Sequence, residues 1–213
     1  MEFFNKLIET IKFQSNHTLL ITQETFKALV DAIAPKSSEL SIGALELHTE
    51  EYLIWTLNHI VTLVFVNKDI NVPLDNATAE MLNIAAEELI KKDEKEKSMD
   101  SVFISKKGTL AALEPSDRIR AIALLEERQI DLTILPFPFS KNQGFVLAIT
   151  RLLTSLTTFG YYSNWSAYDT TRLETPEKRI LEEFPAGWKE VGYPGPSKGY
   201  RALRGYLFDQ FEE

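Results

Sequence analysis

Residues 141–168, KNQGFVLAITRLLTSLTTFGYYSNWSAY, contain the boundary between two kinds of sequence in this chain. Their first twenty residues carry apolar side chains at helical spacing, which predicts an amphipathic helix. Gly160 is expected to end this helix, because glycine tolerates the left-handed conformation that follows many helices. Four aromatic residues follow without a clear helical period: Tyr161, Tyr162, Trp165 and Tyr168. The stretch therefore predicts a helical core over residues 1–159 and a distinct C-terminal segment over residues 160–213, packed on the same domain.

The two regions also differ in composition. Residues 1–159 hold three of the nine glycines and one of the seven tyrosines, and residues 160–213 hold the remaining six of each. The alternation of strands and helices that is typical of a doubly wound fold is missing. With 213 residues, 44% of them apolar, the chain is long enough for a sizeable core. We expect a mostly α protein, a single-domain irregular helical bundle with a long Gly/Tyr/Pro-rich C-terminal segment wrapped on it.

Apolar spacing in the first region predicts several more amphipathic helices. They are expected at residues 3–12, at 23–34, at 45–68 as one long or two abutting helices, from 76 to the charged run at 91–97, and at 117–129. Three sites offer side chains that suit N-caps, namely Thr22, Asp75 or Asn76, and Ser116. The inner face of the helix after Asn76 is expected to carry Met81, Leu82, Ala85 and Leu89.

Residues 132–139, LTILPFPF, are apolar but contain Pro136 and Pro138. Proline cannot donate a backbone hydrogen bond, so this stretch cannot form a central strand. We expect an extended connector laid over the core.

Charge and composition exclude several classes of function. The net charge of −8 argues against nucleic acid, whose phosphates require clustered lysine and arginine. The absence of cysteine excludes thiol catalysis, disulfide scaffolds and iron–sulfur ligation by this chain. The most apolar window, residues 52–66, is shorter than the roughly 20 residues of a membrane span, so no membrane insertion is expected.

Motifs that would carry chemistry or a metal are also missing from the sequence. No phosphate loop, Gly-x-Ser-x-Gly or His-Glu-x-x-His motif occurs, so no catalytic residue and no cofactor in this chain are predicted. His48 and His59 share a face if they lie on one helix, but about 16 Å would separate them, which is too far for a single metal. We therefore expect no metal site, with His59 as a hydrogen-bonded core residue and His17 in a loop.

The C-terminal segment contains a stiff turn. In Tyr193-Pro194-Gly195-Pro196, proline and glycine occupy the two inner positions of a type II turn. Such a loop is either a corner of the scaffold or a preformed contact surface, which preorganisation favours. The turn is followed by Tyr200, Arg201 and Arg204. The two arginines are three residues apart, so they share a face if this stretch is helical.

We predict that the aromatic, Pro/Gly and arginine residues of this segment form an interface with another protein. Tyrosine and tryptophan combine a large apolar body with a polar tip, which suits such a surface, and arginine binds carboxylates well. The predicted interface residues are Tyr161, Tyr162, Trp165, Trp188, Tyr193, Pro194, Gly195, Pro196, Tyr200, Arg201 and Arg204. The alternatives are that the rings fold back over the core of their own domain and that the arginines pair with the chain's own carboxylates.

Two motifs of this segment resemble those of the small-subunit family of gluconate 2-dehydrogenase, also called subunit 3 or the gamma subunit. They are GYYSN at 160–164 and GWKEVGYPGP at 187–196, and LLITQETFKALVDAIAPK at 19–36 is similar to the opening of the family. The resemblance covers about 55 C-terminal residues and the opening twenty, and between them only the helical pattern agrees.

The resemblance implies a non-catalytic accessory subunit of a large flavoprotein of the glucose–methanol–choline oxidoreductase type. That partner would hold FAD and oxidise a sugar or sugar acid, and a cytochrome subunit accepts the electrons in some complexes. The residues that match the family motifs would form the interface with the partner. They are Trp165, Trp188, Tyr193, Pro194 and Gly195.

Two features depart from the family. The twin-arginine export signal of many members is missing, so a cytoplasmic complex is expected, with export alongside the partner as the alternative. The usual Gly-Gly-Asn neighbourhood of the family is also replaced here by YYSNWSAYDTTR, so the resemblance does not identify the particular partner protein. A different reading of the chain is an independent helical ligand-binding domain or enzyme, whose C-terminal segment is a lid over a pocket lined by Tyr161, Trp165, Trp188 and Arg204.

Overall fold

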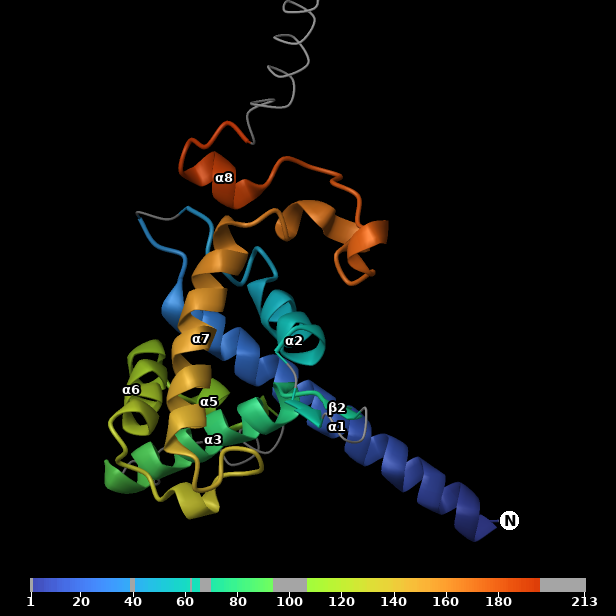
Figure 1. Ribbon diagram of the computed structural model, residues 1–213, viewed down its shortest axis with the longest axis vertical. Coiled ribbons are helices and arrows are strands. Elements are labelled where there is room, and N and C mark those ends of the chain that lie inside the picture. The colour runs from blue at the N-terminus through green and yellow to red at the C-terminus, as the bar shows by residue number, and fades with distance from the viewer. Residues whose placement is uncertain (1, 39–40, 62, 66–69, 94–106, 196–213) are drawn as a thin grey trace, which may run out of the picture.

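The computed structural model describes residues 2–38, 41–61, 63–65, 70–93 and 107–195, and these are mostly helical, as expected (Figure 1). The helices are α1 (Glu2–Ile33), α2 (Thr49–His59), α3 (Asp75–Lys92), α5 (Thr109–Ala112), α6 (Pro115–Glu126), α7 (Gln143–Tyr162) and α8 (Ala186–Glu190). Short 3₁₀ turns occur at η2 (Leu132–Ile134), η3 (Ser166–Thr171) and η4 (Pro176–Lys178). The strands β1 (Leu63–Phe65) and β2 (Ile70–Val72) pair antiparallel.

The apolar core lies among the second half of α1 and helices α2, α3, α5, α6 and α7, which pack against one another. Its members from α1 include Phe26, Leu29 and Val30, which recur at helical spacing and are fully buried. The predicted inner face of α3 is confirmed, because Met81, Leu82, Ala85 and Leu89 are all buried. The first half of α1 extends beyond the other helices in Figure 1.

The N-terminal helices predicted at residues 3–12 and 23–34 form one continuous helix. No glycine or proline separates the two segments, so nothing interrupts the helical backbone between them. The predicted N-cap at Thr22 is therefore wrong: this residue lies inside α1, and its hydroxyl donates a hydrogen bond to Oδ1 of Asn76 at 2.7 Å. His17 likewise lies in α1 and not in a loop. Helix α1 ends before Pro35, as expected.

The helix predicted over residues 45–68 is wrong at both ends. Turns occupy 44–48, α2 ends at His59, and residues 63–65 form β1 opposite β2, with Leu63 paired to Val72. Residues 60–66, IVTLVFV, are rich in β-branched side chains, which favour a strand over a helix. His59 is exposed at the end of α2, where its ring stacks on Trp55, so its predicted place in the core is also wrong.

Two further N-caps differ from expectation. Helix α3 begins at Asp75 after Leu74, and no side chain caps it. Helix α6 begins at Pro115, one residue before the predicted cap Ser116, because the fixed φ of proline suits the first helical position and its missing N–H is not needed there. Residues 132–139 form η2 and a turn that buries Leu135 and Phe139 against the core, so the predicted connector is there but its predicted extended conformation is wrong.

Gly160 does not end α7, which continues to Tyr162. A Cβ at Gly160 would lie 2.7 Å from Cδ1 of Tyr52 and 3.0 Å from Cγ2 of Thr49. The glycine therefore permits the close approach of α7 to α2, and this is a packing role and not a capping role. Beyond α7 the chain forms η3, η4 and α8 and runs across the ends of α2 and α7, in orange to red in Figure 1.

Gly187 in α8 has a similar but stricter role, because a Cβ there would collide with the backbone carbonyl oxygen of Tyr161. We expect Gly187→Ala to push α8 off the end of α7 and to lower the free energy of unfolding by about 1–3 kcal/mol, measured by urea denaturation. Gly144→Ala in the first turn of α7 is the matched control, since its nearest neighbour would be Oδ1 of Asn142 at 3.9 Å. Equal stability of the two variants would contradict this packing role.

Candidate functional site

The first part of the C-terminal segment is held by an aromatic clamp, formed by Trp55, Trp165 and Tyr168 around Arg179. The guanidinium carbon of Arg179 lies 4.2 Å from the ring centroid of Trp55 and 4.9 Å from that of Trp165. It also lies 5.9 Å from the ring of Tyr168. A cation over a desolvated aromatic face is attracted by the ring quadrupole, so the clamp ties residues 163–182 to α2.

Trp165 and Tyr161 anchor the segment from inside the molecule. Nε1 of Trp165 donates a hydrogen bond to the carbonyl oxygen of His48 at 3.0 Å, and the hydroxyl of Tyr161 donates one to the carbonyl oxygen of Ile42 at 2.8 Å. Each residue is only 2% exposed. Their placement at the predicted interface is therefore corrected: both rings pack within their own chain, and their polar tips bond to loop carbonyls instead of to a partner.

The second part of the segment forms a smaller aromatic unit around Trp188. Its ring packs edge-on against Phe184 and Tyr193, and its Nε1 donates a hydrogen bond to the carbonyl oxygen of Tyr162 at 2.5 Å. Gly195 lies buried beside the Trp188 ring with φ of 91°, the positive value that a type II turn requires. Tyr193 and Gly195 thus both lie beside the Trp188 ring.

Other predicted interface residues divide into two groups. Tyr162, Tyr193 and Pro194 are exposed, so a partner can reach them, and their interface role stays a prediction. Pro196, Tyr200, Arg201 and Arg204 lie outside the described residues.

Exposed apolar side chains concentrate in this part of the chain. The structure describes side-chain exposure for residues 18–38, 41–61, 72–93 and 107–195; of the fifteen large apolar residues that are exposed there, eight lie between residues 159 and 193. We call this set the apolar platform; it consists of Phe159, Tyr162, Leu173, Ile180, Leu181, Phe184, Val191 and Tyr193. These eight residues are close in sequence; single exposed apolar residues are normal, whereas a contiguous patch of them marks a contact surface.

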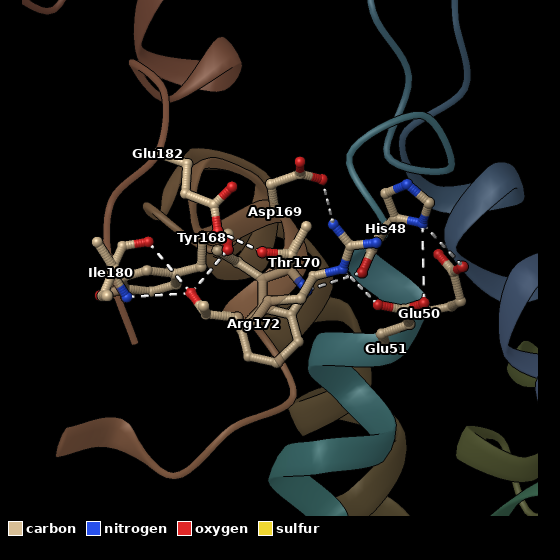
Figure 2. Close-up of polar contacts among 11 residues, drawn as sticks. His48, Glu50, Glu51, Tyr168, Asp169, Thr170, Arg172, Ile180 and Glu182 are labelled. Atoms are coloured by element: carbon tan, nitrogen blue, oxygen red, sulfur yellow. Dashed lines mark hydrogen bonds and ion pairs between the residues drawn. The ribbon is translucent and has the colours of Figure 1, made fainter. Parts of the chain in front are cut away.

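Beside the clamp, the turn before α2 and the first turn of α2 bring together an acid cluster of His48, Glu50 and Glu51 (Figure 2). Nδ1 of His48 lies 3.9 Å from Oε1 of Glu50 and 3.9 Å from Oε1 of Glu51. His48 adopts a left-handed conformation with φ of 54°, which is uncommon for a residue with a Cβ. This conformation turns the imidazole back over the two carboxylates.

Arg172 of the C-terminal segment completes the surroundings of the cluster. Its Nε donates to Oε2 of Glu51 at 2.6 Å, and its side chain is only 15% exposed. Nearby, two hydrogen bonds join residues 170–171 to residues 180–182 of the segment. The Thr170 hydroxyl donates to Glu182, and the Ile180 amide donates to the Thr171 hydroxyl (Figure 2). The sequence reasoning missed this arrangement, although the spacing of His48, Glu50 and Glu51 around a helix start was a usable signal.

Glu50 is the most perturbed member of the cluster. The residue is 4% exposed, and burial raises the pKa of its carboxyl from 4.5 to about 7, with the neighbouring Glu51 charge adding to the effect. Its Oε2 atom has no hydrogen-bond partner among the described residues. The site therefore holds a carboxylate that its surroundings leave poorly compensated.

The two larger cavities among the described residues do not include any residue of the acid cluster. One of about 520 Å³ lies on the outer side of α7, lined by Thr154, Ser155, Thr158, Phe159, Tyr162 and Ser163. Another of about 430 Å³ lies where α1, α3 and Gly108–Thr109 meet. Of the residues expected to line a pocket under a lid, Tyr161 and Trp165 are buried in packing contacts, and Arg204 lies outside the described residues.

Comparisons of the chain with protein-family models, with curated proteins and with solved structures find no match. Among the described residues, no helix combines the length and the apolar character that crossing a membrane requires.

The pKa of Glu50 makes stability depend on pH. Because the folded-state pKa is raised, the folded protein binds this proton more tightly than the unfolded chain, so stability is lost as the pH rises from about 4.5 to 7. In buffer free of divalent cations, we expect Glu50→Gln to raise the free energy of unfolding by roughly 2 kcal/mol more at pH 8 than at pH 5. Urea denaturation at both pH values measures this, with Glu177→Gln on exposed η4 as the control. A gain that is the same at both pH values would contradict the proposed burial cost.

The clamp predicts a large effect at Arg179 and a small one at its neighbour. We expect Arg179→Ala to lower the free energy of unfolding by roughly 1–2 kcal/mol and to expose residues 163–182 to proteases, since the cation between the rings is lost. Lys178→Ala removes an adjacent cation whose side chain is 71% exposed, and limited proteolysis is expected to leave this variant like the wild type. Equal cleavage of both variants would mean that the clamp does not hold the segment.

Proposed function

We propose that this chain is a non-catalytic small subunit of an FAD-dependent sugar or sugar-acid dehydrogenase, and that it supports folding or assembly of the large flavoprotein subunit. The observation that carries the proposal is the apolar platform, seven of whose eight exposed side chains lie in the segment with the family-like motifs. An apolar surface of this kind is stabilised when a partner removes it from water.

The motif residues contribute in two ways under this proposal. Trp165 and Trp188 donate their indole N–H groups to backbone carbonyls of their own chain, which fixes the segment before a partner binds. Tyr193 and Pro194 are exposed beside Trp188 and would contact the partner directly. A surface that is already ordered loses less conformational entropy on binding, which favours affinity.

The partner has a defined chemistry in this proposal. It is a glucose–methanol–choline type flavoprotein that holds the FAD and performs the oxidation, with a cytochrome as a further subunit in some such complexes. This chain would bring no cofactor to the reaction, and we place the complex in the cytoplasm.

Co-purification tests the proposal. An affinity-tagged full chain expressed in its native host is expected to bring down a larger polypeptide with flavin absorbance. The double variant Ile180→Ser with Leu181→Ser removes two exposed side chains of the platform, and we expect it to weaken this association by roughly thirtyfold.

The matched control replaces two exposed isoleucines outside the platform, Ile60→Ser with Ile119→Ser. Ile60 is as exposed as Ile180, at 64%, and Ile119 is 43% exposed against 53% for Leu181, so both double variants remove comparable apolar surface. The control is expected to retain the partner. Recovery of the wild-type chain without a flavoprotein, or equal loss in both double variants, would refute the proposal.

A further inference from the structure

We propose that His48, Glu50 and Glu51 form a binding site for one divalent first-row transition-metal ion, with Zn²⁺ as the reference ion. This inference does not depend on the proposed function, because it concerns the acid cluster and not the apolar platform. It rests on the geometry of the three side chains, on an unpaired buried carboxylate oxygen and on the chemistry of the ligand atoms.

The three ligand atoms lie near enough to one another for side-chain rotation to bring them onto one ion. One imidazole nitrogen and two carboxylate oxygens lie within 4.8 Å of one another. Zinc binds nitrogen and oxygen ligands at about 2.1 Å in a tetrahedral arrangement, so two of its ligands lie about 3.4 Å apart. The largest separation in the cluster would have to shorten by up to about 1.4 Å, which rotation of the partly exposed His48 and Glu51 side chains can supply.

Glu50 provides the independent observation that points to a ligand. Its side chain is 5% exposed and points toward the His48 ring (Figure 2), while its Oε2 has no hydrogen-bond partner among the described residues. A buried carboxylate is costly unless a cation or several donors compensate it. Arg172 does not serve Glu50 directly, because its Nε bonds to Glu51.

The surroundings hold the remaining ligands in place. Arg172 binds Oε2 of Glu51 and thereby leaves Oε1 of that carboxylate facing His48. Trp165 holds the His48 backbone by a hydrogen bond to its carbonyl oxygen. Second-sphere contacts of this type orient metal ligands. The His48 side chain is 46% exposed, so water can reach the open coordination positions.

The ligand set selects the class of ion. Imidazole nitrogen favours zinc and other first-row transition metals, whereas Mg²⁺ and Ca²⁺ prefer sites made of oxygen alone. Three protein ligands, with water at the remaining positions, also leave the ion open to exchange.

Calorimetric titration of the untagged full-length chain with zinc chloride tests the proposal. The protein is first stripped with a chelator and dialysed, and a polyhistidine tag is avoided because it would bind zinc itself. We expect one saturable site per chain, and binding of Mg²⁺ that is weaker by about a hundredfold or more.

Three variants locate the site. His48→Gly removes the imidazole while keeping a residue that tolerates the left-handed backbone, and Glu50→Gln removes one carboxylate. Each is expected to weaken zinc binding by about tenfold to a hundredfold. His59→Ala is the matched control, since it removes an exposed histidine from the other end of α2 and is expected to bind zinc like the wild type.

A measurement on the wild type alone complements the variants. The chain has three histidines, so their imidazole resonances can be resolved by NMR, and zinc is expected to shift those of His48 and not those of His59. Absence of saturable binding, equal affinity in His48→Gly and the wild type, or zinc shifts confined to His17 or His59 would each overturn the proposal.

Discussion

The burial of Trp165 against α2 is the contact on which the C-terminal half of the site depends. Its ring lies beside Tyr52 and Trp55, its indole N–H bonds to the carbonyl of His48, and the Arg179 guanidinium lies over its ring. This hydrogen bond holds the left-handed His48 backbone from the side of the C-terminal segment. The ring thus couples the turn before α2 to residues 163–182.

Charge is distributed across this contact in a consistent way. The segment contributes two cations, Arg172 and Arg179, and α2 offers a carboxylate to one and an aromatic face to the other. Arginine suits both tasks because its planar guanidinium pairs with carboxylates and stacks on rings. Neither arginine bonds to Glu50, and Oε2 of this buried carboxylate has no hydrogen-bond partner among the described residues.

Helical pattern alone located α3, α6 and α7 and the buried face of α3, because apolar periodicity is a local property. The helix starts were less predictable: Thr22, Asp75 and Ser116 all have side chains that suit N-caps, yet tertiary contacts or a proline decided their places. Tyr161 and Trp165 were assigned to an interface because their amphipathic chemistry fits a partner as well as it fits a loop carbonyl of the same chain. The sequence does not indicate which backbone carbonyl lies nearby in three dimensions. The left-handed backbone conformation of His48 could not be predicted from the sequence either.

The contacts that close the junction join residues far apart in the chain. The hydrogen bonds from Trp165, Tyr161 and Arg172 span 117, 119 and 121 positions. Because a ribosome delivers the N-terminal part first, α2 emerges long before the residues that cover it. During synthesis its tryptophan and its acidic first turn stay open to water and to chaperones, and the junction is among the last parts of the described fold to assemble.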